Sequence, residues 1–218
     1  MYKLRLHFSK TGRARFISHL DLMATMQRAL LRAGVKLKYS EGFNPHPYLS
    51  VALPIKVGCE SLCELADIGV TDHEYPAGLI GTITSALPEG IEIIEAYIPE
   101  RKFSKIKWLE ISGVLYYGRQ KPDNISKRLS ERFAVESIVI SKRTKRGVTD
   151  IEIKPFIRDV EFKGDSEVTM TAKISAQEPS LNPDDLMESL NGTYCELKPN
   201  HTEMTRKEIY DENVKVFR

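Results

Sequence analysis

Four side chains in the first quarter of the sequence could support acid–base chemistry: Lys10, His19, Tyr39 and His46. An imidazole exchanges a proton near neutral pH, and an ammonium or phenol beside it can assist the transfer. Such a set could cleave RNA without a metal, because the 2′-hydroxyl of RNA serves as an internal nucleophile. In the ordinary interpretation, His19 begins a helix and His46 is a hydrogen-bonding loop residue. The sequence therefore favours a protein without catalytic activity, with a metal-independent endoribonuclease as the alternative.

The sequence predicts neither a metal nor a nucleotide cofactor. His19 and His46, together with Asp21 or Glu41, could ligate a metal, but their spacing matches no known ligand motif. The sequence also contains no G-x-G-x-x-G, phosphate-binding loop, G-x-S-x-G or H-E-x-x-H pattern. We therefore expect no cofactor and no serine nucleophile.

The three cysteines form no recognisable metal or disulfide framework. Cys59 and Cys63 begin the C-x-x-x-C-x-x-C pattern of radical-SAM iron–sulfur sites, but Ala66 occupies its third position. If residues 57–70 form one strand, the two thiols lie about 13 Å apart at ~3.3 Å per residue, too far to share a metal. An odd number of cysteines without framework spacing is typical of a reducing compartment.

Basic residues in the same region predict an anion-binding surface. A helix beginning at Ser18 would place its free N–H groups beside the basic turn at residues 10–15, which favours phosphate binding. Arginine can also bind phosphate through two parallel hydrogen bonds. The alternative is an ordinary amphipathic helix with solvated arginines. The residues that we assign to nucleic-acid or anion binding, and expect to meet in space, are Lys10, Arg13, Arg15, Arg28, Arg32, Asn44 and His46.

Charge is distributed unevenly along the chain. The net charge is only +2, but residues 1–56 carry ten Lys/Arg and two acidic residues. Residues 57–100 carry nine acidic residues and no Lys or Arg, and residues 101–218 carry a net +3. The basic block predicts an anionic partner such as RNA. Two alternatives are a solvated face neutralised by the acidic strands, and an adaptor whose acidic segment docks a partner protein.

The stretch SEGFNPHP at residues 40–47 is predicted to form a stiff loop. Pro45 and Pro47 fix their own φ angles and keep the preceding residues extended. Phe43 and Tyr48 flank the prolines, and Phe16 precedes the helix. Aromatic rings beside a basic patch can stack on bases, although these rings could equally anchor the loop to the core. A second basic stretch, KRTKRG at residues 142–147, predicts a hairpin tip that contacts a phosphate backbone or is simply exposed.

Residue periodicity predicts an α+β fold made of two tandem ferredoxin-like (βαββαβ) halves. Ser18 is the expected N-cap of the first helix, with Asp21 in a capping box and Gly34 at the helix end. In the first half we expect helices at residues 18–34 and 76–87 and strands at residues 2–8, 37–39, 49–57, 62–70 and 91–98. In the second half we expect helices at residues 123–134 and 182–190 and strands at residues 109–117, 135–140, 149–153, 159–162, 168–174 and 204–210. We assign residues 1–100 to the first domain, 101–107 to a linker and 108–218 to the second domain.

Composition is that of a soluble globular protein. Of 218 residues, 41% are apolar and 28% are charged, which suits a packed core in each of two domains. No apolar run approaches the ~20 residues that a membrane span needs, and the opening MYKLRLHF lacks the apolar segment of a secretory signal. We therefore expect a cytoplasmic protein that does not associate with membranes.

Three segments, KTGRARFISHLDL, QRALLRAG and YSEGFNPHPYLSVALPIKVGCES, resemble the radical-SAM-linked domain family, an uncharacterised bacterial family. SHLDL and SEGFNPHP carry the most specific likeness, and the later KRTKRGVTDIEIKPFI and NPDDLMESL also fit. The sequence departs from the family pattern near residues 175–179, and Asn182 stands where that pattern has an arginine before the helix. The family motif falls on Lys10, Gly12, Arg15, Phe16, Ser18, His19, Asp21, Arg28, Arg32, Tyr39, Ser40, Gly42, Phe43, Asn44, Pro45, His46, Pro47, Ser50 and Gly58.

This resemblance implies a partner rather than a reaction. Members of the family are fused behind, or encoded beside, a radical-SAM protein of the B12-binding type, and tend to be encoded near ribonuclease and ribosomal-protein genes. The implied role is an RNA-binding or substrate-presenting module that acts with a separate radical-SAM enzyme. Tandem ferredoxin-like halves also occur in CRISPR repeat-processing endoribonucleases, which is an analogy of fold alone.

Overall fold

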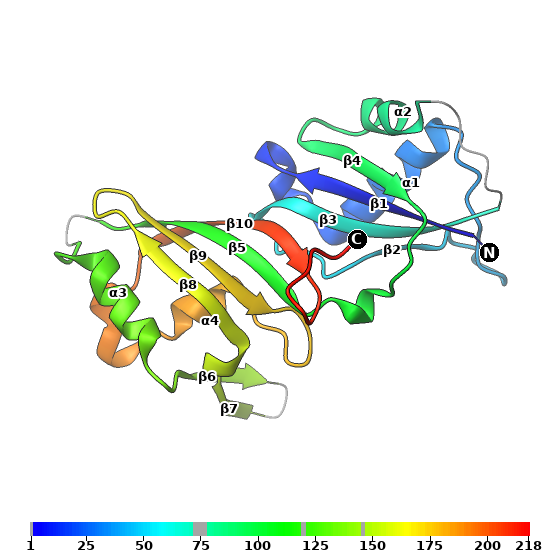
Figure 1. Ribbon diagram of the computed structural model, residues 1–218. Coiled ribbons are helices and arrows are strands. Elements are labelled where there is room, and N and C mark those ends of the chain that lie inside the picture. Colours follow the sequence, from blue (N-terminus) through cyan, green and yellow to red (C-terminus); the bar gives the residue numbers. More distant parts are fainter. Residues whose placement is uncertain (1, 72–77, 119–120, 145–146) are drawn as a thin grey trace. The chain divides into compact units, whose positions relative to one another are not determined.

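The structure is a computed structural model that describes residues 2–71, 78–118, 121–144 and 147–218. The chain has a mixed α+β fold in which the strands pair antiparallel, so the expected fold class is confirmed at that level. It divides into two compact units, Met1–Lys105 together with Arg218, and Ile106–Phe217. Each unit contains its own strands and helices (Figure 1).

The first unit is built on a four-stranded antiparallel sheet in the order β4-β1-β3-β2. Its helices α1 and α2 cover one face of this sheet, where their apolar side chains pack on Leu6 and Phe8 of the first strand. The elements are β1 (Tyr2–Lys10), α1 (His19–Arg32), β2 (Leu49–Val51), β3 (Glu60–Val70), α2 (Leu79–Ala86) and β4 (Ile91–Tyr97).

Alternation along β1 decides which side chains enter the core. Leu4, Leu6 and Phe8 face the helices and are buried, as the sequence pattern predicts. They are paired in register with Ile68, Ala66 and Glu64 of β3, respectively. Because side chains on a strand alternate between its two faces, Arg5 lies on the other face of the sheet, opposite Asp67.

The predicted cap of α1 is confirmed. The Asp21 N–H donates to the Ser18 hydroxyl oxygen at 3.2 Å, and that hydroxyl donates to the Asp21 carboxylate at 2.7 Å. At the other end, Gly34 takes φ +76°, a left-handed conformation that glycine adopts without steric cost. Four buried residues spaced along the helix face the sheet: Leu22, Met26, Ala29 and Leu30.

Several predicted strands of this unit are shorter than expected. β2 ends at Val51, because Leu53 adopts φ +48° and Pro54 cannot donate to a ladder. Residues 37–39 form only isolated bridges. The expected strand across residues 57–70 begins at Glu60, and Cys59 lies in the preceding turn, so the assumption that both thiols sit on one strand was wrong. The second helix begins at Leu79, and the first residues predicted for it, 76–77, fall outside the described ranges.

The second unit repeats this order with one additional hairpin. Its four-stranded antiparallel sheet has the order β10-β5-β9-β8, and the hairpin β6-β7 forms a separate sheet. The Phe133 and Phe162 rings pack at 5.4 Å between centroids within its core. The elements of the second unit are β5 (Trp108–Tyr116), α3 (Ile125–Ala134), β6 (Val139–Thr144), β7 (Gly147–Glu152), β8 (Ile157–Lys163), β9 (Val168–Ser175), α4 (Pro183–Glu188) and β10 (His201–Tyr210). Short 3₁₀ segments lie at Gly12–Phe16 and Phe103–Lys105 in the first unit, and at Lys154–Phe156 and Gly192–Leu197 in the second unit.

Polar side chains fix the hairpin β6-β7 to the rest of the second unit. Lys142 donates to the Asp185 carboxylate at 2.9 Å, and the same carboxylate accepts the Asn182 N–H at 2.8 Å in the capping box of α4. Asn182, the residue that departs from the family pattern, thus begins this helix. Two residues of the predicted basic hairpin tip, 145–146, lie outside the described parts of the chain.

Candidate nucleic-acid interface

Residues 40–46 form a loop that is closed at its base, and we call it the closed loop. The Ser40 N–H donates to the His46 carbonyl at 2.8 Å, and the His46 N–H donates to the Ser40 hydroxyl at 3.1 Å. His46 Nδ1 lies 3.0 Å from the same hydroxyl. Tyr39 and Pro47 form a bridge immediately outside this contact. The predicted stiffness of the SEGFNPHP stretch therefore has a defined cause, in which side-chain hydrogen bonds reinforce the two prolines.

The tip of the closed loop presents an aromatic ring to solvent. Phe43 is 107% exposed, as open as in an isolated peptide, and it follows Gly42, which has φ +118°. Burying a phenylalanine side chain stabilises a fold by about 1.5–3 kcal/mol, and this ring contributes none of that to folding. The ring is therefore open to contact by a ligand.

Four basic residues lie along the chain that leads into the closed loop, and we call them the basic row: Arg28, Arg32, Lys36 and Lys38. All four are exposed. Arg28 and Arg32 are one turn apart on α1, so they share one side of the helix. Lys38 is tied to the loop base, because the Tyr48 N–H donates to its carbonyl at 2.9 Å. The basic row and the exposed ring of Phe43 therefore belong to the same end of this unit.

A hollow of about 200 Å³ lies beside the base of the closed loop. Its walls come from residues 46–50 and 67–69 together with Lys3. Ser50 pairs in register with Asp67 across β2 and β3, which places both on the face of the sheet away from the helices. The hollow therefore combines His46, Ser50, Lys3 and a carboxylate, a polar set at the base of the closed loop.

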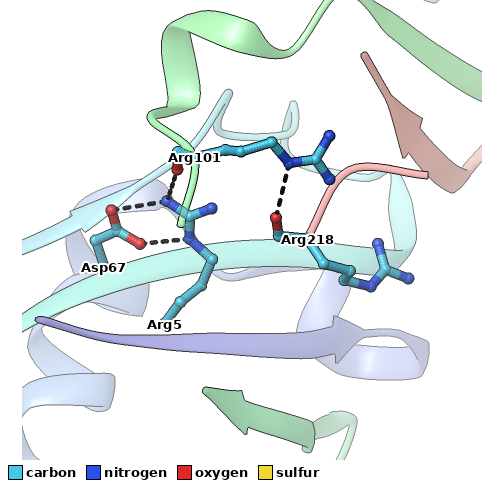
Figure 2. Close-up of polar contacts among 4 residues, drawn as sticks. All are labelled: Arg5, Asp67, Arg101 and Arg218. Carbon is cyan, nitrogen blue, oxygen red and sulfur yellow. Dashed lines mark hydrogen bonds and ion pairs between the residues drawn. The ribbon is translucent and has the colours of Figure 1, made fainter. Parts of the chain in front are cut away.

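The carboxylate of Asp67 is held by a buried arginine. Arg5 Nε lies 2.6 Å from Asp67 Oδ1, and Arg5 Nη2 lies 3.0 Å from Oδ2 and 2.9 Å from the Arg101 carbonyl (Figure 2). The ring of Phe103 covers the Arg5 guanidinium at 4.3 Å, and Arg5 is 0% exposed. A two-point ion pair of this kind fixes the orientation of the carboxylate.

The last residue joins the same network. Arg101 Nε donates to the Arg218 main-chain oxygen at 3.3 Å (Figure 2). Arg218 Nη1 also approaches Cys63 Sγ at 3.6 Å. Burial raises the pKa of the Tyr97 phenol, and the positive charges of Arg5 and Arg218 oppose that rise. The contacts among Asp67, Arg5, Arg101 and Arg218 therefore connect β1 with Arg218 within this unit.

The basic turn at the start of α1 is occupied by the chain's own acidic groups. Glu60 accepts the Gly12 N–H at 2.8 Å and lies 3.8 Å from Arg15 Nη1. Asp21 fills the N-terminus of the helix together with Ser18. The anion site that we expected at this helix start is thus neutralised from within, although Arg13 remains exposed.

The predicted site residues divide between opposite ends of the sheet. Glu60, beside the basic turn, and Ile68, beside residues 47–50, are eight residues apart on β3, about 26 Å at ~3.3 Å per residue. His19 therefore lies at one end and His46 at the other. The expectation that all seven anion-binding residues meet in space was wrong, because α1 runs the length of the sheet between them.

The candidate catalytic residues do not converge. Lys10 is only 2% exposed at the end of β1, so it cannot join the solvent-facing surface that we expected. Tyr39 packs against the hydrophobic core of the unit. His19 is exposed at the first position of α1, whereas His46 is engaged with Ser40 through Nδ1. Among the described residues, no group of three or more His, Cys, Asp or Glu side chains is arranged to hold a metal ion.

On the sheet of the second unit, basic and aromatic side chains contact partners within the same unit. Arg158 lies over the Trp108 ring at 4.2 Å, and Lys173 pairs with Asp159 at 2.7 Å. The Tyr116 hydroxyl donates to Glu203 at 3.1 Å. Aromatic and basic residues on this face are thus bound to one another, which leaves the closed loop as the more available aromatic surface.

Sequence reasoning missed Arg5, Asp67, Lys36 and Lys38 as parts of this region. Arg5 alternates with the core residues Leu4 and Leu6 on β1, and only the pairing with β3 reveals that it is buried against Asp67. Lys36 and Lys38 alternate with the buried Leu37, a signal that could have placed them on the surface beside the loop.

Comparison with known proteins gives a family but no activity. No curated protein matches this chain. Among solved structures, an unknown protein from Galdieria sulphuraria aligns over 94% of this chain and 98% of its own, with 8% sequence identity and a TM-score of 0.28. In the parts of the chain that the structure describes, no helix has the length and apolarity that crossing a membrane requires. The chain belongs to the family described as "Uncharacterized protein conserved in bacteria" (DUF2344), whose model matches residues 3–183.

Proposed function

We propose that the protein is a non-catalytic RNA-binding or substrate-presenting module. The observation that carries this proposal is the fully exposed ring of Phe43, held by a closed loop beside a row of exposed basic residues. Aromatic rings stack on unpaired bases, and basic side chains track the phosphates between them. The two features together suit a single-stranded loop or bulge in a structured RNA.

Each part of this region has a distinct task in the proposed complex. Phe43 stacks on a base, and Arg28, Arg32 and Lys38 contact phosphates. Among the described residues, no side-chain hydrogen bond or ion pair occupies Arg28, Arg32 or Lys38. Asn44 and His46 supply polar edges that can contact a base or a 2′-hydroxyl.

The endoribonuclease alternative receives less support. Acid–base cleavage needs two groups within hydrogen-bond reach of the same phosphodiester. His19 and His46 lie at opposite ends of the sheet, and Lys10 is buried. The adaptor alternative concerns the acidic segment at residues 57–100, of which Glu60 and Asp67 already have partners within this unit.

Within this proposal, the partner is a separate radical-SAM enzyme in the cytoplasm, as the resemblance of the SHLDL and SEGFNPHP motifs implies. We also assign both units to the ferredoxin-like class. The orders β4-β1-β3-β2 and β10-β5-β9-β8 both match the fourth, first, third and second strands of a βαββαβ unit, if β6-β7 is counted as an insertion. Each unit then corresponds to one domain.

Equilibrium binding to a fluorescein-labelled RNA hairpin with an eight-nucleotide loop tests the proposal. We expect wild-type protein to bind this hairpin more tightly than a fully paired duplex of equal length. Equal binding to both, or none to either, would contradict it. Intact RNA after prolonged incubation separates binding from cleavage.

A further inference from the structure

The strand β4 presents a free edge at the side of the first unit away from β2. In the sheet order β4-β1-β3-β2 it is the end strand, and within the described residues it pairs with β1 alone. The free side of such a strand carries main-chain N–H and C=O groups that can pair with another strand. This edge is separate from the closed loop, which adjoins β2.

Exposed apolar side chains lie along this edge. Ile98, just after β4, is 64% exposed, and Ile94 is half exposed within the strand. A hollow of about 380 Å³ lies beside Ile98 on the side of the helices, lined also by Leu79, Ile80 and Ala96. An exposed strand edge beside an apolar hollow is the arrangement that accepts an added strand with alternate side chains in pockets.

The charged side chains on and beside β4 indicate what kind of strand could pair with this edge. Glu92 and Glu95 are exposed on β4, and Glu89 and Glu100 are exposed close to its two ends. Residues 57–100 contain no Lys or Arg to neutralise them. Sheet edges are commonly protected by lysine or proline, and this edge carries glutamates alone. The register opposite Ser9 and His7 places Glu92 and Glu95 on the face away from the helices.

We propose that β4 binds an extended basic segment of a partner protein, which adds to the sheet as a further strand. Its apolar side chains would lie toward Ile98 and the hollow, and its alternate Lys or Arg side chains toward Glu92 and Glu95. The segment is therefore defined by alternation of apolar and basic residues. This surface is independent of the proposed RNA contact, and either can fail without the other.

A designed peptide tests this surface directly. The probe is the acetylated and amidated heptapeptide KVKVKVK, titrated into ¹⁵N-labelled full-length protein and followed by amide chemical shifts. We expect shift changes to be centred on residues 91–98. The peptide EVEVEVE should bind at least about fivefold more weakly, because it reverses the charge complementarity. A KVKVKVK peptide N-methylated at alternate residues should not bind, because it lacks the main-chain donors.

Variants of the protein complete the test. Glu92→Lys/Glu95→Lys should weaken binding of KVKVKVK at least about fivefold, whereas the matched control Glu136→Lys/Glu212→Lys, at exposed positions in the second unit, should leave it unchanged. Ile98→Ala should weaken binding without a change of charge. Equal binding of the N-methylated peptide, or equal losses in the control variant, would overturn the proposal. Concentration-dependent dimerisation that protects the β4 amides would also overturn it, since a second copy would then be the occupant.

Discussion

Arg5 and Asp67 form a two-point ion pair between β1 and β3, with Nε–Oδ1 and Nη2–Oδ2 distances of 2.6 and 3.0 Å. The guanidinium is fully buried, whereas the carboxylate reaches the hollow beside the closed loop. One strand pairing therefore links the sheet interior to the candidate interface. Through Arg101 it also reaches the main-chain oxygen of Arg218.

Removing one partner of this pair should destabilise the first unit strongly. Asp67→Ala leaves the Arg5 charge buried without its counter-ion, a change that costs about 3–5 kcal/mol in comparable pairs. Urea unfolding followed by hydrogen exchange of β1 and β3 amides measures it. The exposed control Glu136→Ala should change stability by less than about 0.5 kcal/mol. Equal midpoints for Asp67→Ala and wild type would show that the pair contributes little.

Opening the closed loop should weaken RNA binding without unfolding the protein. Ser40→Ala removes the hydroxyl that contacts both the N–H and Nδ1 of His46. We expect faster hydrogen exchange at the His46 amide. We also expect RNA affinity to be lower by a factor of about five, because the entropy of ordering the loop is then lost on binding. Unchanged affinity with a demonstrably mobile loop would separate stiffness from recognition. Ser130→Ala, an exposed serine on α3, is the matched control.

The ring of Phe43 should contribute directly to binding. Loss of one stacked base costs about 1–3 kcal/mol, so Phe43→Ala should lower affinity for the looped RNA hairpin by about fivefold or more. Phe16→Ala removes an exposed ring at the other end of the sheet and should have little effect. The reverse result, in which only Phe16→Ala weakens binding, would move the interface to the basic turn. Thermal unfolding of both variants should match wild type.

Acid should weaken the anchor of the hairpin β6-β7. Hydrogen bonds from Ser137 and from the Ile138 and Lys154 N–H groups lower the pKa of Glu152. A lowered folded-state pKa means that the stabilisation is present above the unfolded pKa of about 4.3 and is lost as pH falls through the folded value. Glu152→Gln should therefore be less stable than wild type at pH 7, and the difference should shrink as pH falls below the unfolded value and vanish below the lowered folded-state pKa of Glu152. A difference that does not shrink as pH falls would assign the effect to shape rather than charge.

Burial should keep the Tyr117 phenol neutral in alkali. Burial raises its pKa to about 12, and its hydroxyl donates to the Leu197 carbonyl at 2.8 Å. Because the folded pKa exceeds the unfolded value of about 10, the contribution is complete below pH 10 and is lost as pH rises toward 12. Ultraviolet titration of wild type and Tyr117→Phe should show the same number of phenols ionising between pH 9 and 11, because Tyr117 ionises only near pH 12. A normal titration of Tyr117 would contradict its burial.

The sequence predicted individual helices and strands better than it predicted which residues of different elements contact one another. Ser18 with Asp21 and the alternation of Leu4, Leu6 and Phe8 are local patterns, and the structure follows them. The pairing of Arg5 with Asp67 joins residues 62 positions apart and depends on strand register, which no local pattern contains.

The same limit explains the divided site. Residues 10–50 are continuous in sequence, but α1 alone spans about 21 Å at ~1.5 Å per residue. His19 and His46 were expected to lie close together because they are near one another in the sequence, but α1 separates them. Burial of Lys10 was likewise hidden, because a lysine that ends a strand is ordinarily exposed.

The salt dependence of RNA binding tests the central claim most directly. Affinity of the looped hairpin should fall with rising KCl, and the slope of log affinity against log salt should become shallower by about 1 to 2 in Arg28→Ala/Arg32→Ala, since each lost phosphate contact removes ~0.7–0.9. The charge-matched control Lys127→Ala/Lys163→Ala should keep the wild-type slope. A slope that Arg28→Ala/Arg32→Ala leaves unchanged, or binding that does not depend on salt, would contradict an RNA-binding role for this surface.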